Sequence, residues 1–248
     1  MIIYGINPVL EALRAGRVKE LRVGDRADPR LKQLLALAVD RGVRVRRVPS
    51  DALDRDSRRG VHQGVVADVE KVAPYSVEEI VRGASGAPLV VVLDGIEDPH
   101  NLGAILRTAD AAGVDGVVIQ SRRSAAREGV AAKASAGALA YVKIAEVVNI
   151  ARAVEELKAS AVWTVGLAGD APDVYDSIDL TLPTAIVLGA EGTGLRRLVR
   201  ERCDRLASIP MLGHVGSLNV SVATGVVLFE AVRQRRLEAG KREKQRSP

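Results

Sequence analysis

The stretch PLVVVLDGIEDPHNLGAILRTADAAG, residues 88–113, combines a continuous apolar run, a polar turn with a proline, and a helical pattern. Four further apolar runs each precede a helical or turn segment: GVVIQ (116–120), VWTVGLAG (162–169), TAIVLGAE (184–191) and RLASIPM (205–211). Uninterrupted apolar strands are typical of a parallel sheet that is buried on both faces. The sequence therefore predicts an α/β domain with helices on both sides of a mostly parallel sheet, and with ligands beyond the carboxyl ends of its strands.

The first third of the chain shows the same alternation on a smaller scale. We expect strands at residues 21–24, 43–49 and 64–70, with helices at 7–15 and 28–41. These elements predict a second, smaller α/β unit.

Residues 71–88 interrupt this alternation with two prolines and several small residues. Such segments commonly join domains, so we place the boundary here. We expect an amino-terminal domain over residues 1–72, a linker over 73–87 and a larger domain over 88–240. The last long helix is expected over 217–240, and the basic tail 241–248 is expected to fray into disorder.

Composition narrows the class of protein. The 248 residues are 47% hydrophobic, which is enough for a sizeable core. No run reaches the roughly 18 apolar residues of a membrane span, and the first residues lack a secretion-signal pattern, so we expect a cytoplasmic protein without a membrane partner. The single cysteine, Cys203, cannot form an internal disulfide, and three scattered histidines predict no metal site. We expect Cys203 to be a buried small side chain, since no histidine stands near it in sequence.

The net charge of +5 is distributed unevenly. Residues 1–83 hold 16 Lys/Arg against 12 Asp/Glu, residues 84–232 hold 13 against 17, and residues 233–248 hold 7 against 2. Basic ends around an acidic middle suit a polyanionic partner such as RNA, although solvated surface charge accounts for the counts equally well. The six aromatic residues argue against a single-strand reader built from stacking platforms.

Polar residues follow the first strand of the larger domain. Four of them carry side chains that can bind metals: Asp94, Glu97, Asp98 and His100. We favour capping and backbone hydrogen bonding over a metal site, because acids in such turns commonly serve those roles. Asn101 is predicted to cap the following helix, with Arg107 about two turns further along.

Two later strand ends carry a second and a third polar segment. In IVLGAEGTGLRR (186–197) three glycines surround Glu191, but neither the phosphate-loop nor the dinucleotide spacing is present. Glycine there permits close approach of the backbone to a ligand, and a plain strand-to-helix turn is equally consistent. In SIPMLGHVGSLNVSVATGVVLFEA (208–231), Ser217 and Asn219 bracket the start of a helix. Ser217 could be its N-cap and Asn219 a residue of its first turn, and a functional role for both is equally consistent with the sequence.

Together these segments resemble a known family. The trio Asn101…Arg107, LGAEG (188–192) and IPM…SLNVSVA (209–223) resembles, in order, spacing and identity, the three motifs of the SpoU/TrmH family of RNA ribose 2′-O-methyltransferases. Upstream, YGINPV (4–9) and GVHQG (60–64) are similar to the amino-terminal RNA-binding domain of the 23S ribosomal RNA guanosine methyltransferases within it. The resemblance thus covers nearly the whole chain.

One intermediate stretch matches the family less well. Residues 133–138 keep its Lys…Ser-Ala-Gly-Ala pattern, whereas three preceding arginines are less characteristic: Arg122, Arg123 and Arg127. They are expected either to touch RNA or to be solvated.

The resemblance implies a trefoil-knotted α/β methyltransferase domain of the SPOUT type behind a small α/β RNA-binding domain. It also implies S-adenosylmethionine as cofactor, RNA and not DNA as partner, and a homodimer with each active site near the subunit interface. By matching position, the active-site residues are Asn101, Arg107, Glu191, Ser217 and Asn219. The cofactor pocket is lined by Leu188, Gly189, Gly192, Ile209, Met211 and Leu218. No metal is implied.

Methyl transfer from a sulfonium requires the 2′-oxygen, methyl carbon and sulfur to be nearly collinear, and the hydroxyl must lose its proton. The family assigns the proton-accepting role to the Arg107 position, which is chemically awkward because guanidinium groups hold their protons tightly. Arg107 is therefore expected either to become transiently neutral, aided by a phosphate or by Ser217, or to stay cationic and stabilise the developing alkoxide while another group accepts the proton. Glu191 is better suited to orienting Arg107 or the RNA, and the two asparagines to fixing geometry.

Other functions remain open at this point. Within the class, the substrate could be transfer RNA, or the enzyme could be an antibiotic-resistance ribosomal RNA methyltransferase. A different class is a non-catalytic RNA-binding ribosome-assembly factor, which need not bind S-adenosylmethionine. A nucleotide-dependent oxidoreductase is disfavoured, because the dinucleotide glycine fingerprint and its acidic residue are missing.

Overall fold

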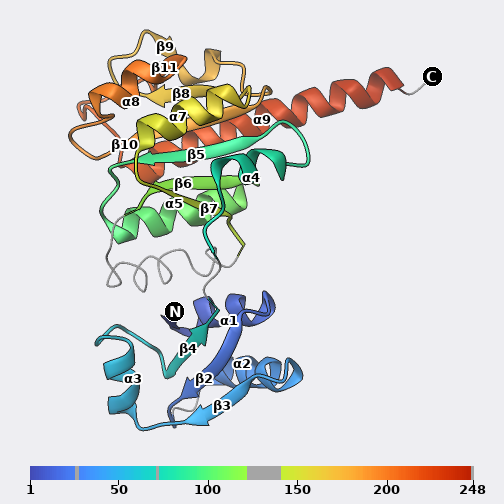
Figure 1. The fold of residues 1–248 in the computed structure, drawn as a ribbon, viewed down its shortest axis with the longest axis vertical. Coiled ribbons are helices and arrows are strands. Elements are labelled where there is room, and N and C mark those ends of the chain that lie inside the picture. The colour runs from blue at the N-terminus through green and yellow to red at the C-terminus, as the bar shows by residue number, and fades with distance from the viewer. Residues whose placement is uncertain (26–27, 71–72, 122–140, 247–248) are drawn as a thin grey trace. The chain divides into compact units, whose positions relative to one another are not determined.

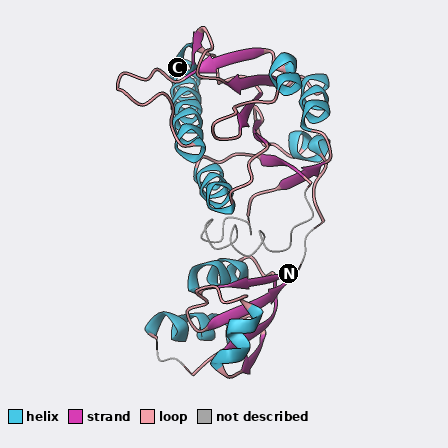
Figure 2. Cartoon of the chain, turned by 90° about the vertical axis from the view of Figure 1, so that its left-hand side faces the viewer, coloured by secondary structure: helices cyan, strands magenta, loops and turns pink. Residues whose placement is uncertain are grey.

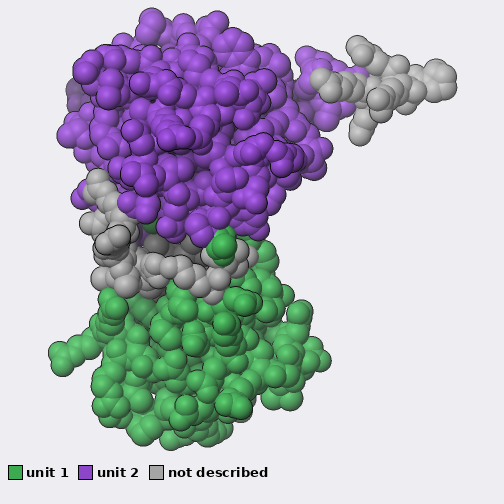
Figure 3. Space-filling view, in the orientation of Figure 1, with its two compact units in different colours: residues 1–73, 102–107, 123–141 green, residues 74–101, 108–122, 142–248 purple. Residues whose placement is uncertain are grey.

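The computed structural model describes residues 1–25, 28–70, 73–121 and 141–246 (Figure 1). The chain divides into two compact units (Figure 3), the first built on Met1–Ala73 and the second on Pro74–Asn101 and most of the chain after residue 107. The family-like positions 133–138 and the arginines at 122, 123 and 127 lie outside the described residues. None of the described helices combines the length and apolar character that crossing a membrane requires.

The first unit is a four-stranded sheet with helices on both faces. In chain order its elements are β1 (Ile2–Tyr4), α1 (Ile6–Arg14), β2 (Val18–Val23), α2 (Pro29–Asp40), β3 (Arg44–Arg47), α3 (Ser50–Asp56) and β4 (Val65–Val69). The strand order is β1-β4-β2-β3, and β4 runs antiparallel to both of its neighbours. Only β2 and β3 are parallel, so this sheet is mixed and not mostly parallel as the alternation of elements predicts.

Two small cores hold this first unit together. Leu21, Val65 and Ala67 point to the face that the buried residues of α1 and α2 cover. Val66 points the other way and packs with Tyr4 and with Leu53 of α3. The sheet is therefore buried on both faces, as the continuous apolar run of β4 requires.

The second unit is a seven-stranded sheet in which every neighbouring pair is parallel, which agrees with the predicted mostly parallel sheet, although β7 and β9 were not among the five expected strands. Its helices and strands are α4 (Val77–Arg82), β5 (Leu89–Asp94), α5 (Pro99–Ala111), β6 (Gly116–Gln120), β7 (Ile144–Val147), α7 (Ile150–Ala159), β8 (Trp163–Leu167), β9 (Asp173–Val174), β10 (Thr184–Gly189), α8 (Arg197–Arg202), β11 (Arg205–Ser208) and α9 (Val220–Arg246). The strand order is β7-β6-β5-β10-β8-β11-β9, and Figure 2 shows helices on both sides of the sheet.

Alternate strand residues face the two helical layers of this unit. Val90, Val92 and Val187 belong to a core with residues of α4, α7 and α8. Val91, between Val90 and Val92, is equally buried and points to the opposite face. Every position of β5 is thus buried, which explains the uninterrupted apolar run.

Two helix starts correct the sequence expectations. Helix α5 begins at Pro99 and its N-cap is Asp98, whose Oδ1 accepts a hydrogen bond from the backbone N–H of His100 at 2.9 Å; Asn101 does not cap it. Helix α9 begins at Val220 and not at Ser217, and Asn219 Oδ1 accepts from the backbone N–H of Ser221 at 2.9 Å. Because proline has no N–H and a preset φ, it favours the first helical turn, and this property selects Asp98.

Helices α4 and α9 extend into the segments expected to be a linker and a tail. Val77 and Ile80 of α4, inside the expected linker 73–87, are buried in the core of the second unit. Helix α9 continues past Lys241 to Arg246, so the expected end near residue 240 is too early. Arg235 anchors this helix, because its guanidinium donates hydrogen bonds to the carbonyl oxygens of Leu180, Ala87, Pro88 and Leu182.

Candidate active site

The ends of β5 and β10 form one edge of the larger sheet. These strands are parallel neighbours, and Gly189 lies opposite Asp94 in the register. The segments that follow them therefore start side by side. The chain after β11 begins two strands away from β10, on the far side of β8, and covers residues 209–219 before α9 starts.

Three side chains from these three segments form one hydrogen-bonded network. Asn101 Nδ2 donates to Glu191 Oε1 at 3.0 Å, and Asn219 Nδ2 donates to the same oxygen at 2.6 Å. Asn219 Nδ2 also lies 3.0 Å from Asn101 Oδ1. A carboxylate only accepts, so both amides must present their nitrogen to Glu191, and this fixes the orientation of both. Residues up to 118 positions apart in sequence thus meet in one place.

The network lies between a buried and an exposed environment. Asn101 is 8% exposed, whereas Glu191 and Asn219 are exposed. Asn219 Oδ1 is occupied by the start of α9, because it accepts from the backbone N–H and the hydroxyl of Ser221. Asn219 therefore links the helix start to Glu191, and the Glu191 carboxylate keeps its second oxygen for another donor.

A buried ion pair supports the same edge. Asp94 is 0% exposed and accepts hydrogen bonds from the backbone N–H of Arg196 at 2.8 Å and from its Nε at 2.6 Å. The guanidinium Nη2 contacts the same carboxylate. Arg196 is not among the residues expected from sequence to form the site. Its role depends on the register of β5 and β10, which no local pattern records.

The acids that could have held a metal have other partners. Asp94 binds Arg196, and Asp98 caps α5. Across the described part of the chain, no group of three or more His, Cys, Asp and Glu side chains is placed to hold a metal ion.

The loop after β10 closes on itself. Ala190 N–H donates to Gly194 O at 3.1 Å and Gly194 N–H donates to Ala190 O at 2.8 Å, and Gly192 has a φ of 78°. A Cβ added to Gly189 would lie 2.1 Å from the carbonyl carbon of Gly194, so no other residue fits there. Sequence analysis attributed this glycine to close approach of a ligand. The structure shows that the backbone of its own loop occupies the space.

The segment between β11 and α9 offers backbone groups and apolar side chains. Residues 210–218 make no backbone hydrogen bond to any other described residue. Ile209, Met211 and Leu218 are half-buried, and Leu188 of β10 is buried. Unpaired backbone donors and acceptors next to half-buried apolar side chains fit a ligand with a planar heterocycle and hydrogen-bonding edges, such as the adenosyl group of S-adenosylmethionine.

Two expected active-site residues lie outside the network. Arg107 is on α5, six residues after Asn101, and is exposed. Ser217 is exposed in the segment before α9. Neither side chain makes a hydrogen bond or an ion pair with a residue that the structure describes. The structure therefore brings together three of the five expected residues.

Cys203 packs against the core of the second unit but is half-buried, so it is less enclosed than the sequence predicts. Burial, with help from the charge of Asp204, raises the pKa of its thiol to about 12. The Sγ donates to the carbonyl oxygen of Val199 at 3.3 Å. A thiol that stays protonated at neutral pH is a poor nucleophile, so this residue has a packing role.

Comparison with known proteins assigns the fold and the site to a family. The model of the SpoU rRNA Methylase family matches residues 88–229, which includes every member of the network. The chain belongs to this family. A second family model, described as RNA 2′-O ribose methyltransferase substrate binding, matches residues 2–75. The two matches correspond to the larger and the smaller sheet.

Relatives of known name resemble the chain over nearly its full length. The 23S rRNA (guanosine-2′-O-)-methyltransferase RlmB of Pseudomonas putida is 46% identical over 242 residues, covering 95% of this chain and 97% of the relative. The protein of the same name from Yersinia pestis is 45% identical, with 96% and 99% covered. Among solved structures, the SpoU methyltransferase AviRb from Streptomyces viridochromogenes in complex with AdoMet superposes with a TM-score of 0.80 at 26% identity, covering 95% of this chain and 90% of that one.

Proposed function

We propose that this protein transfers the methyl group of S-adenosylmethionine to a ribose 2′-hydroxyl of RNA, and that the acceptor is a guanosine of 23S ribosomal RNA. The Asn101–Glu191–Asn219 network carries this proposal, because it assembles all three motif segments at one sheet edge. Membership of the SpoU family and the names of relatives at 45–46% identity support the reaction and the substrate.

The cofactor would supply an electrophilic methyl group on a positively charged sulfur. We assign its pocket to residues beside the loop after β10 and in the segment before α9: Leu188, Gly189, Gly192, Ile209, Met211 and Leu218. The apolar side chains of Ile209 and Met211 would exclude water, and the unpaired backbone groups of residues 210–218 would bind the polar edges of the cofactor. Gly189 would shape the pocket by allowing the loop to fold against it.

The remaining residues would position and stabilise the acceptor ribose. Asn101 and Asn219 hold the Glu191 carboxylate in a single orientation, so its free oxygen can fix a donor on the RNA. We assign Arg107 an electrostatic role: its guanidinium would stabilise the negative charge that develops on the 2′-oxygen, while the hydroxyl proton passes to solvent water and the sulfonium leaves as a neutral thioether. Ser217 would contact the ribose or a neighbouring phosphate through its exposed hydroxyl.

The organisation of the active protein is part of the proposal. We assign residues 1–72 to RNA binding, supported by the substrate-binding family model. A trefoil knot is supported by the path of residues 209–219. This segment starts after β11, two strands away from β10, and it ends at Asn219, which contacts Asn101 in the helix that follows β5 in sequence. A homodimer is supported by three exposed apolar residues at helical spacing on α9: Val222, Phe229 and Leu237. The site of action would be the cytoplasm, with the ribosomal RNA.

Methyl transfer from labelled S-adenosylmethionine to protein-free 23S ribosomal RNA tests the proposal. The wild-type chain should methylate one guanosine at the 2′-oxygen, and Arg107→Ala should lose turnover while it still binds the cofactor in calorimetry. Methylation of transfer RNA alone would reassign the substrate. Near-normal turnover by Arg107→Ala would refute the role of that residue.

A further inference from the structure

The smaller unit carries two adjacent arginines on an unusual backbone. In the sequence SRRGVHQG (57–64), Arg58 and Arg59 have φ angles of 52° and 62°, and Gln63 has a φ of 54°. Of the four non-glycine residues with positive φ in the described parts of the chain, three lie in this segment, which we name the arginine loop (residues 57–63). Side chains with a Cβ disfavour this conformation, and residues that hold it cluster at binding sites.

Arg58 occupies a position where helices usually place glycine. It follows Ser57, the C-cap of α3, and its N–H donates to Arg55 O at 3.1 Å, while the N–H of Arg59 reaches back to Asp54 O at 2.7 Å. This is the pattern of a helix terminator whose left-handed residue is normally glycine. Arg58 therefore places a charged side chain at a backbone position that favours glycine.

The arginine loop is held from several sides. Ser57 is 3% exposed, and its hydroxyl lies within hydrogen-bond distance of Asp54 O and Gly60 O. The ring of His62 accepts from Gly64 N–H at 3.0 Å through Nδ1, so its Nε2 carries the proton and donates to Asp54 Oδ1 at 3.2 Å. A Cβ on Gly60 would lie 2.6 Å from the Tyr4 ring, so the middle of the loop packs closely against this ring.

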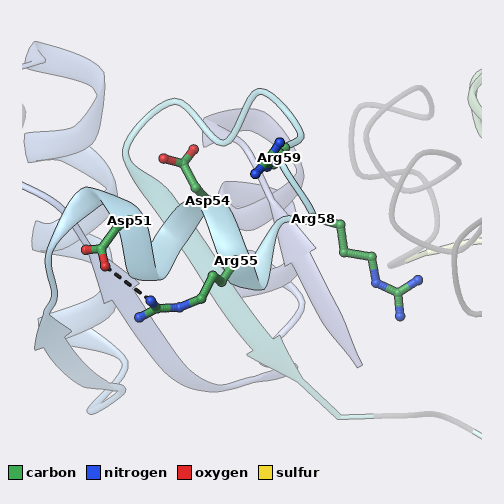
Figure 4. Close-up of a pocket in the computed structure, with 5 residues that line it drawn as sticks. All are labelled: Asp51, Asp54, Arg55, Arg58 and Arg59. Atoms are coloured by element: carbon green, nitrogen blue, oxygen red, sulfur yellow. Dashed lines mark hydrogen bonds and ion pairs between the residues drawn. The ribbon is translucent and has the colours of Figure 1, made fainter.

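The loop borders an open hollow of about 750 Å³ that is lined by Asp51, Asp54, Arg55, Arg58 and Arg59 (Figure 4). Both acids have partners: Asp51 pairs with Arg55 at 3.2 Å, and Asp54 binds His62. The side chains of Arg58 and Arg59 are exposed and form no hydrogen bond or ion pair with a described residue. Figure 4 shows Arg58 extending away from α3. The lining thus holds three guanidinium groups against two carboxylates, and the two guanidinium groups without a described partner, Arg58 and Arg59, stand at the rim of a hollow whose volume is in the range of ligand sites.

We infer that the arginine loop is a phosphate-binding site for the substrate RNA, in which Arg58 and Arg59 each bind a phosphodiester group. The inference rests on the proposed function. A guanidinium binds phosphate through two parallel hydrogen bonds, and a rigid backbone lowers the entropy that binding costs. No aromatic side chain is among the described residues that line the hollow. The site therefore binds the phosphate backbone of the RNA and recognises no base by stacking.

The test compares full-length variants for binding to protein-free 23S ribosomal RNA across a salt series. The pair Arg58→Gly/Arg59→Gly should lower RNA affinity about 25-fold at 0.1 M salt, because each phosphate contact contributes about 0.7 to the salt slope and so about fivefold between 0.1 and 1 M. The salt slope itself should fall by about 1.4. The melting temperature should stay the same or rise, since glycine relieves the left-handed backbone.

Three matched controls separate the effect of losing positive charge from the effect of relieving the left-handed backbone. Arg58→Gln/Arg59→Gln keeps the backbone restriction and should lose the same affinity. Ala161→Gly relieves the fourth positive φ without removing a charge, and Arg152→Gln removes an exposed charge from α7 of the second unit; both should bind RNA within about twofold of wild type. The inference is overturned if the glycine pair binds RNA normally, if only the glycine pair and not the glutamine pair loses affinity, or if Arg152→Gln loses as much.

Methyl transfer separates this inference from the proposed function. At saturating RNA the glycine pair should keep its kcat and show a raised KM for RNA, with unchanged binding of S-adenosylmethionine. If the wild-type chain transfers no methyl group although the arginine pairs lose RNA affinity, the proposed function fails and the binding site stands. If the wild type methylates RNA and the pairs bind and react as it does, the proposed function stands and the site is refuted.

Discussion

Removing the guanidinium of Arg196 should loosen the edge of the larger sheet that carries the Asn101–Glu191–Asn219 network. Arg196 and Asp94 are 102 positions apart, and the side chain contributes the Nε hydrogen bond and the Nη2 contact to a carboxylate that is 0% exposed. Arg196→Ala keeps the backbone N–H bond but leaves the buried charge without its cation. Breaking a buried pair in this way typically costs about 3–5 kcal/mol.

The environment of Arg196 lowers this figure. Its side chain is 50% exposed, so water can enter and solvate one side of the Asp94 carboxylate in the variant. We therefore expect the free energy of unfolding of the second unit to fall by about 2–3 kcal/mol. The affinity for S-adenosylmethionine should also fall, because Arg196 comes directly after the loop that begins at Gly189.

Urea unfolding followed by the fluorescence of Trp163, the single tryptophan of the chain, reports on the second unit. Arg200→Ala is a matched control: it removes a bidentate pair with Asp170, at 2.8 and 3.0 Å, from the exposed surface of the neighbouring helix α8. Surface pairs contribute about 0–1 kcal/mol. If Arg196→Ala loses no more stability than Arg200→Ala, or if a double-mutant cycle with Asp94→Ala shows no coupling, the structural role assigned to this pair is wrong.

Three further changes have defined outcomes. Gly189→Ala would place a Cβ 2.1 Å from the Gly194 carbonyl carbon, so the loop must move and calorimetry should show at least about tenfold weaker binding of S-adenosylmethionine, a loss of about 1.4 kcal/mol; unchanged affinity would refute the fit. Arg235→Lys cannot reach four carbonyl oxygens with one ammonium group, so urea unfolding should show a loss of about 2–4 kcal/mol. Because burial raises the pKa of the Cys203 thiol to about 12, iodoacetamide at pH 8 should alkylate it far more slowly in the native chain than in urea; equal rates would contradict its burial.

The position of a strand was easier to predict than its direction. The apolar run at residues 64–70 indicated the strand that forms β4. It did not indicate that β4 runs antiparallel to both neighbours, because side-chain burial is the same for either direction. Short elements such as β1, α3, β7 and β9 were not predicted, because two to seven residues are too few to establish a period.

The members of the network could be predicted, but their local roles could not. Asn101, Glu191 and Asn219 stood out because each follows an apolar strand and matches a family motif. Several polar residues near each helix start could have been the cap, and the general preference for Asp, Asn and Ser does not distinguish them. The neighbouring residues decide the choice. Pro99 at the first helical position selects Asp98, and Ser221 at the second position of α9 gives Asn219 a backbone and a hydroxyl donor.

The two carboxylates at this edge differ in their partners, and this difference explains why both are present. Asp94 is fully buried, and the cation beside it neutralises its charge, so it serves to hold the loop. Glu191 is exposed and its protein donors are two neutral amides, with no ion pair to a described residue. Neutral donors orient a carboxylate without cancelling its charge, so Glu191 keeps a negative field at the edge where we place a positively charged sulfonium and the guanidinium of Arg107. Glu191→Gln tests this reasoning: it can still accept both amide hydrogen bonds, yet it should weaken S-adenosylmethionine binding more than binding of neutral S-adenosylhomocysteine, and an equal effect on the two ligands would refute it.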